Sequence, residues 1–131
     1  MLSAAEIKSG LAQFYGTEAY HKFSPLHGRL VATDGVAFLV KSAEAVWLLD
    51  IIASYQPQCL KDGMLKHIQF WTLTVKDKKA KIVCERDEGK VAFTQVIGHT
   101  DFPLEGETKV WVEADECGGQ PVMVAMLPEE R

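Results

Sequence analysis

Residues 67–99 read HIQFWTLTVKDKKAKIVCERDEGKVAFTQVIGH, and this stretch decides the fold. Apolar and polar side chains alternate along it with a period of two, which is the pattern of half-buried β-strands. Asp87-Glu88-Gly89 supplies a glycine where a three-residue hairpin loop needs a positive φ, whereas the turn at Asp77-Lys78-Lys79 lacks one. The stretch therefore predicts three consecutive antiparallel strands, at residues 67–75, 80–86 and 90–99.

Two further strands are predicted at residues 109–114 and 122–127, where apolar and polar side chains again alternate. The residues between them, 115–121, have the glycine, proline and acidic composition of an exposed loop. The second half of the chain is therefore expected to form an antiparallel meander of about five strands.

Helical signals lie in the first half of the chain. Ser3 followed by Glu6 is a capping-box pattern, and apolar residues recur after it at helical spacing until Gly16. Residues 17–23 are expected to add another turn of helix, and residues 28–33 a short extended segment. Thr33-Asp34-Gly35 marks the start of the next helix, because Thr33 or Asp34 can cap its free N–H groups.

A further helix is expected at residues 44–55, with Pro57 ending it. It is apolar nearly all round, which is typical of a helix buried on most sides, inside the domain or against another subunit. Helices followed by strands indicate the α+β class, with N-terminal helices packed on a C-terminal antiparallel β-meander in a single domain of residues 1–131. The sheet could also close into a cone with a pocket, by analogy of element order and length with proteins similar to nuclear transport factor 2.

Composition and charge argue against several classes of protein. The net charge is −4 and there are only three arginines, whereas nucleic-acid-binding proteins present a basic face. The most apolar window, residues 36–53, contains Lys41, Glu44 and Asp50, which would be costly at bilayer depth. The N-terminus lacks the pattern of a signal peptide, and the spacing of the three cysteines matches no metal or redox motif. We therefore expect a soluble cytoplasmic protein with neither nucleic-acid nor membrane partners.

Short motifs spread over nearly the whole chain resemble a bacterial family of small proteins known only as a domain of unknown function. The motifs are Tyr15-Gly16-Thr17-Glu18-Ala19-Tyr20, Gly28-Arg29-Leu30, Thr33-Asp34-Gly35-Val36, Trp47-Leu48-Leu49-Asp50, Ile52-Ala53-Ser54-Tyr55-Gln56, Phe70-Trp71-Thr72-Leu73-Thr74-Val75, Thr100-Asp101-Phe102-Pro103-Leu104 and Met126-Leu127-Pro128. The resemblance implies carriage by phages, plasmids and other mobile elements. It transfers no activity and no catalytic residue.

Asp50 is the polar residue that most needs an explanation. It interrupts the apolar helix, where a buried carboxylate would cost several kcal/mol unless it is paired or hydrogen-bonded. One interpretation is an acid in a pocket, and the other is a structural carboxylate bonded to Ser54, a tyrosine, Arg29 or loop amides. Tyr55 and Gln56 end the same helix, where they would either line a cleft or cover an edge of the core.

His99 lies two residues before Asp101, which suggests acid–base chemistry. No nucleophile motif accompanies the pair, and Asp101 is more typical of a turn. The remaining histidines match no zinc pattern, and no cysteine has a visible activating neighbour. The sequence therefore predicts neither a metal nor a cofactor.

Apolar residues occupy both faces of the predicted sheet. Trp71 shares its strand face with Leu73, whereas Ile68 and Phe70 take the other face, and Trp111 likewise opposes apolar neighbours. One face is expected to be core. The other is either an aromatic surface for a partner or is covered by a second core layer from the first helix.

No phosphate-binding loop and no kinase, hydrolase or metalloprotease signature is present. The leading hypothesis is a non-enzymatic binding or protein-interaction module that forms a homo-oligomer or meets a protein partner. The alternative is a small-molecule-binding or enzymatic domain with a pocket between helix 44–55 and the sheet. A third interpretation is a regulator that uses its acidic C-terminal third against a basic partner. The candidate binding residues are Asp50, Tyr55, Gln56, His99, Trp71 and Trp111.

Overall fold

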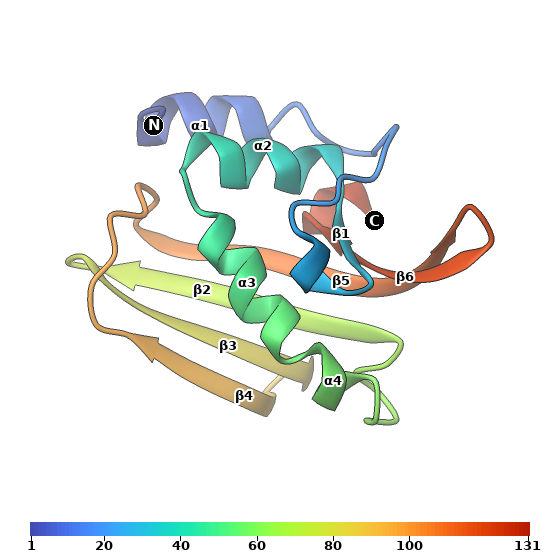
Figure 1. The fold of residues 1–131 in the computed structure, drawn as a ribbon. Helices are drawn as coiled ribbons and strands as arrows, with labels where there is room; N and C mark the ends of the chain where they lie inside the picture. Colours follow the sequence, from blue (N-terminus) through green and yellow to red (C-terminus); the bar gives the residue numbers. More distant parts are fainter.

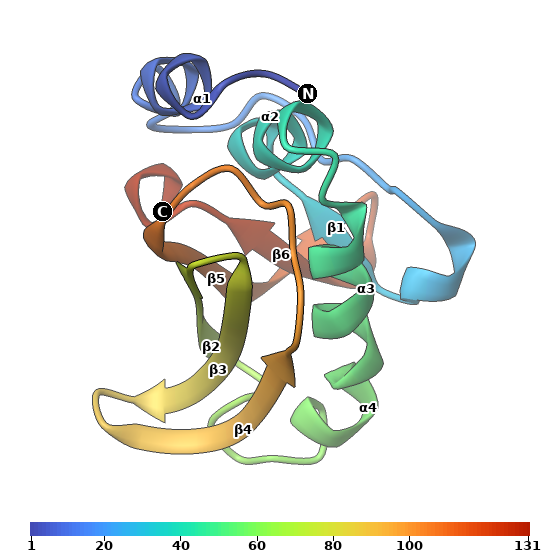
Figure 2. The same ribbon diagram turned by 90° about the vertical axis from the view of Figure 1, so that its left-hand side faces the viewer.

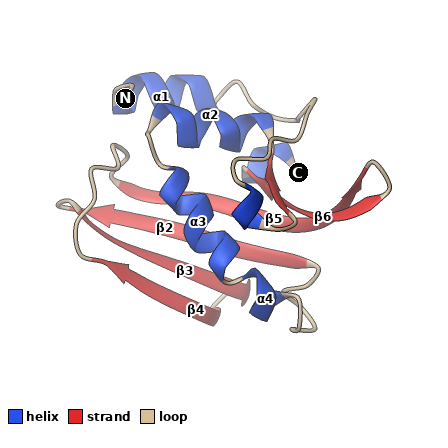
Figure 3. Cartoon of the chain, in the orientation of Figure 1, coloured by secondary structure: helices blue, strands red, loops and turns tan.

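The computed structural model describes all residues, 1–131, and shows a curved sheet with helices on one side (Figure 1). The helical elements are α1 (Ala4–Leu11), η1 (Pro25–His27), α2 (Asp34–Ser42), α3 (Val46–Ser54), α4 (Gln56–Cys59) and η2 (Pro128–Glu130). The strands are β1 (Leu30–Ala32), β2 (Ile68–Lys76), β3 (Lys79–Asp87), β4 (Lys90–Ile97), β5 (Gly106–Cys117) and β6 (Gln120–Met126). Figure 3 separates the helices of the first half from the strands of the second half.

All six strands form one sheet in the order β1-β6-β5-β2-β3-β4. The strands β2 to β6 pair antiparallel, and β1 pairs parallel with β6. The predicted α+β class with a C-terminal antiparallel meander is confirmed. The meander gains a sixth strand, because the extended segment predicted at residues 28–33 joins the sheet.

The core lies between α2, α3 and the concave side of the sheet (Figure 2). Along β2 the burial alternates strictly, so that Trp71 and Leu73 face the helices and Phe70 faces away. Leu48, Leu49 and Ile52 of α3 are fully buried against that face. The predicted packing of the apolar helix on one side of the sheet is confirmed, and the face that carries Trp71 is the core face.

Local caps fix where the helices begin. The Ser3 hydroxyl accepts from Glu6 N–H and the Glu6 carboxylate accepts from Ser3 N–H, which confirms the capping box of α1. Thr33 caps α2, as predicted, by accepting from Val36 N–H. Glu130 at the other end of the chain adds to this cap, because its carboxylate accepts from Thr33 Oγ1 and Gly35 N–H. The N-terminus of α2 favours this negative charge.

The helical turn predicted at residues 17–23 is wrong. This segment is extended, and His21 exchanges backbone hydrogen bonds with Ala32 beside β1. The Asp34 carboxylate holds it there by accepting from Glu18 N–H at 2.9 Å and from His21 Nε2 at 2.7 Å. The same hydrogen bonds, first that of Glu18 N–H, lower the pKa of Asp34. Contacts with residues distant in sequence therefore override the local helical signal.

Three element boundaries also differ from the prediction. Helix 44–55 is shorter, running as α3 from Val46 to Ser54, and Pro57 lies in the first turn of α4 instead of ending a helix. A proline is tolerated there because the first N–H groups of a helix have no partner within it. The loop predicted at 115–121 is mostly strand, closed by Gly118 and Gly119 at φ values of 58° and 80°. None of the helices has the length and hydrophobicity needed to cross a membrane.

Candidate functional site

Asp50 lies on the surface of α3 and forms a pair with a buried histidine. Its side chain is 62% exposed, and Oδ1 is 2.6 Å from Nε2 of His27, whose side chain is 3% exposed. The expectation that Asp50 is a buried carboxylate is therefore wrong. The proposed hydrogen bonds of Asp50 to Ser54, a tyrosine or Arg29 are also wrong. The Ser54 hydroxyl donates to the Ile51 carbonyl, and the Asp50 carboxylate is hydrogen-bonded to His27.

Gln56 belongs to a buried polar network beneath α4, and it also lines a hollow beside η1 and α4. Its side-chain amide exchanges two hydrogen bonds of 2.9 Å with that of Gln69, which is fully buried. Gln69 Oε1 also accepts from Trp71 Nε1 at 2.9 Å, and Gln69 Nε2 donates to the Leu65 carbonyl. This network satisfies every polar group that β2 buries under α4, so its direct role is to fix α4 on the sheet.

Tyr55 closes the same end of the core. Its ring centroid lies 4.7 Å from that of Phe93 and 5.7 Å from that of Trp71. Its hydroxyl group donates to Gln95 Oε1 at 3.2 Å, so the end of α3 is tied to β4. Tyr55, Gln56 and Trp71 therefore lie together, as a packed unit that joins α3 and α4 to the sheet.

A groove of about 660 Å³ runs between α3 and β4 and contains one of the predicted site residues, His99. Trp47 and Ile51 form its helical wall, and Gln95, Val96 and Ile97 its strand wall. His99 is exposed and lies 3.5 Å from Asp101, which is also exposed. Asp50 and Tyr55 do not line the groove, so the three polar groups proposed for an enzymatic pocket do not converge.

The strand β4 forms a free edge of the sheet with exposed apolar side chains (Figure 1). Val91 is 53% exposed and Val96 is 75% exposed. No charged residue and no proline lies between Lys90 and Ile97. Soluble proteins usually protect an edge with charge, proline or a covering segment, so this edge is unusual. Its one protective feature is a bulge near Val91, where the register with β3 shifts.

The strand register shows which backbone groups of this edge are free. The two-residue turn between β2 and β3 is closed by the hydrogen-bonded pair of Lys76 and Lys79. The N–H and C=O groups of Lys79 therefore point towards β2, and those of the next residue, Ala80, point towards β4. Ala80 pairs with Ile97, so by alternation the groups of Gln95 and Ile97 also point towards β3. The N–H and C=O groups of Thr94 and Val96 therefore point away from the sheet.

Trp111 lies on the convex face of the sheet, which no helix covers at β2, β3 and β4 (Figure 2). It is partly exposed and meets Phe70 edge to face, with ring centroids 5.2 Å apart. The Arg131 guanidinium lies 6.0 Å from the Trp111 ring and is held by Glu113 at 3.0 Å. The prediction that the first helix covers this face as a second core layer is wrong. Arg131, Trp111 and Phe70 cover one another there instead.

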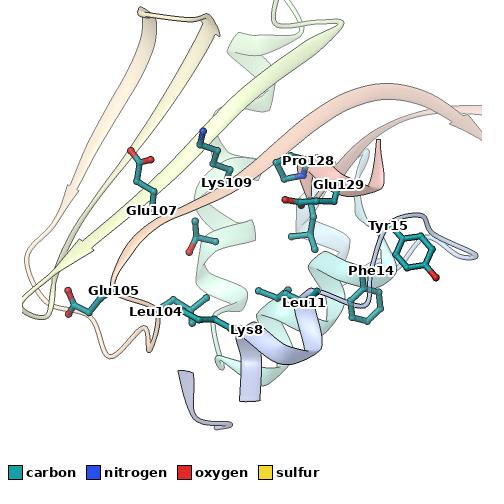
Figure 4. A pocket seen from close by; sticks show the side chains of 13 residues that line it. Lys8, Leu11, Phe14, Tyr15, Leu104, Glu105, Glu107, Lys109, Pro128 and Glu129 are labelled. Carbon is teal, nitrogen blue, oxygen red and sulfur yellow. The ribbon is translucent and has the colours of Figure 1, made fainter. Parts of the chain in front are cut away.

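A second hollow of about 660 Å³ lies between α1, the start of β5 and η2 (Figure 4). Leu11 and Leu104 face each other across it, and Tyr15 points away from it (Figure 4). Two lysines and three glutamates surround it, so its charge favours neither sign of ligand; they are Lys8, Lys109, Glu105, Glu107 and Glu129. None of the candidate residues predicted from the sequence lines this hollow.

The cysteines and histidines do not gather into a reactive centre. No group of three or more histidine, cysteine, aspartate or glutamate side chains lies close enough to hold a metal ion. Burial raises the pKa of the Cys59 thiol to about 11 and that of the Cys84 thiol to about 12. Both thiols are therefore poor nucleophiles at neutral pH. Cys117 is exposed in the β5–β6 turn region.

The predicted binding residues did not include His27 and Arg29, which lie together in the structure. Both line a third hollow, of about 410 Å³, beside η1 and α4. Asp50, a carboxylate in an otherwise apolar helix, was the one sequence feature that indicated a partner such as His27. No signal in the sequence indicated that Asp50 meets His27, because 23 positions separate them.

Comparison with known proteins places the chain in a family without supplying an activity. No curated protein matches the chain, and no solved structure matches it. One family model does match, and it spans residues 5–131, which is nearly the whole chain. The chain therefore belongs to the family described as a family of unknown function (DUF6876).

Proposed function

We propose that this protein is a non-enzymatic interaction module that works as a homodimer, joined by antiparallel pairing of β4 with β4 of a second copy. The observation that carries the proposal is the free, uncharged edge of β4 with its exposed valines. An edge of this kind is a template for another strand, and main-chain hydrogen bonds supply the affinity of strand addition.

A second copy is the occupant because β4 is complementary to itself. A two-fold axis at Gln95 would place Thr94 opposite Val96 of the partner, with their outward N–H and C=O groups paired. On the concave face the same axis places Phe93 beside the partner's Ile97. These pairs of aromatic and β-branched side chains stabilise antiparallel strands, and no like charges oppose each other.

Proline substitution tests the proposal at single backbone groups. Val96→Pro removes an N–H that points away from β3, so the fold keeps its ladder while the partner strand loses a hydrogen-bond donor. Sedimentation velocity over a concentration series is expected to show a dimer for the wild type and a monomer for Val96→Pro. Thr94→Pro should behave in the same way.

Two controls separate this effect from general damage. Val96→Thr keeps the N–H and the β-branched shape, so it should remain dimeric. Gln95→Pro removes an N–H that β3 needs, so it should lower the melting temperature. A wild type that is monomeric at every concentration, or a folded Val96→Pro variant that remains dimeric, would overturn the proposal.

We further propose that the protein is carried by bacterial mobile elements and folds as a single cytoplasmic domain. Carriage by bacterial mobile elements, a cytoplasmic location and a single folding domain fit a small interaction module. The alternative of an enzymatic pocket between α3 and the sheet receives less support, because Asp50, Tyr55 and His99 lie apart.

A further inference from the structure

The hollow beside η1 and α4 combines an unpaired cation with apolar walls. Its volume is about 410 Å³, within the range of small-molecule sites. Ala53, Pro57, Leu60 and Met123 contribute apolar surface, and Leu26 at its rim is 92% exposed. A leucine exposed to that extent beside a hollow provides apolar contact area that the folded chain itself does not use.

Arg29 supplies the charge of this hollow. Its guanidinium forms no ion pair and no hydrogen bond within the protein, whereas the other two arginines are each held by a carboxylate. Its backbone is fixed, since the Arg29 carbonyl accepts from Met123 N–H at 2.9 Å. Gly28 before it has a φ of 61° and a ψ of −120°, a conformation open only to glycine, and so turns the chain between His27 and Arg29.

His27 brings a second polar group to the hollow. Its Nε2 is engaged by Asp50, and Nδ1 forms no hydrogen bond within the protein. No fully buried side-chain nitrogen or oxygen lacks a partner, so Nδ1 must touch accessible space. Because His27 is otherwise buried and lines the hollow, that space is the hollow. The Asp50 carboxylate holds the ring in this orientation.

We propose that this hollow binds a small carboxylate with an apolar body. Arg29 pairs with the carboxylate, and the doubly protonated His27 ring donates to it from Nδ1 while Nε2 donates to Asp50. The apolar walls cover the hydrocarbon part of the ligand. A guanidinium matches a carboxylate in geometry and charge, and a few polar groups in an apolar pocket are the usual basis of small-ligand specificity. His27 binds the ligand directly, and Asp50 acts as the positioning residue that holds the His27 ring. The site shares no lining residue with β4, so it stands independently of the proposed dimer.

Octanoate is the probe, and octanol and octylamine are the matched neutral and cationic controls. Binding is followed by chemical-shift perturbation in two-dimensional NMR spectra of the full chain, which also locates the site. Octanoate is expected to bind with shifts centred on residues 26–30 and 53–60, and to bind at least about tenfold more tightly than octanol. Octylamine should bind more weakly still.

Arg29→Met keeps the apolar stem and removes the charge, so it should weaken octanoate at least about tenfold and leave octanol unchanged. Lys61→Met removes an exposed lysine that lies next to Leu60 but outside the hollow, and should leave octanoate binding unchanged. Leu26→Ser removes an exposed side chain that the core does not need and should weaken octanoate and octanol alike. Absence of octanoate binding, shifts centred elsewhere, or equal affinities of wild type and Arg29→Met would overturn the proposal.

Discussion

The substitution Gln69→Leu is expected to cost about 3 kcal/mol of folding free energy. Gln69 has the size of leucine and is fully buried, so the change leaves little cavity. It leaves three buried groups without a partner: Gln56 Oε1, Trp71 Nε1 and the Leu65 carbonyl. Gln56 Nε2 loses Gln69 but keeps its hydrogen bond to the Ile52 carbonyl. Each unpaired buried group costs about 1–3 kcal/mol, and we take the low end because the neighbours relax.

A second substitution makes the prediction specific. Gln56→Leu in the Gln69→Leu background removes one of the three unpaired groups, so the double variant should recover about 1 kcal/mol. If the two glutamines acted independently, each substitution would add its own cost. The double variant would then be less stable than either single variant.

The assay is urea unfolding followed by tryptophan fluorescence, with thermal unfolding as a check. A loss of about 3 kcal/mol corresponds to a fall in melting temperature of roughly 9–15 °C for a chain of this size. Gln13→Leu is the control, because Gln13 is exposed, and it should change stability by no more than about 0.5 kcal/mol. A loss below about 1 kcal/mol for Gln69→Leu, or strictly additive effects in the double variant, would refute the reasoning.

Three other predictions concern local features. Lys78→Gly should stabilise the protein by about 0.5–1 kcal/mol in urea unfolding, because Lys78 has a φ of 60° that favours glycine. Asp62→Asn should flatten the loss of stability in acid: hydrogen bonds from two backbone N–H groups and an arginine lower the pKa of Asp62 from 3.8 to about 2, so the wild type keeps this stabilisation above pH 4 and loses it towards pH 2. Ellman's reagent should label Cys117 rapidly in the native protein and Cys59 and Cys84 only after unfolding.

The strands were predictable because their signal is local. Alternation along residues 67–99 identifies the strands without knowledge of their partners, but apolar residues on both faces left open which face is core and whether Trp71 is buried. The capping box of Ser3 and the cap of Thr33 were equally readable, since both lie within one helical turn of the helices that they start.

The features that the sequence did not reveal depend on distant contacts. The parallel pairing of β1 with β6 joins residues more than ninety positions apart, and the segment at 17–23 is held extended by Asp34. Asp50 was correctly identified as unusual, but its partner His27 could not be inferred from spacing. The turn at Asp77 and Lys78 forms in the left-handed region without glycine, because the paired strands on both sides impose it.

The most direct test of the proposed β4 interface is hydrogen exchange of its outward amides. The amides of Thr94 and Val96 have no partner in the single chain, whereas the Gln95 amide is bonded to β3 and serves as the internal control. The account predicts that the amides of Thr94 and Val96 are protected at high protein concentration and become fast-exchanging on dilution, while the Gln95 amide stays protected throughout. Fast exchange of the Thr94 and Val96 amides at concentrations where the protein is dimeric would show that β4 is not the interface.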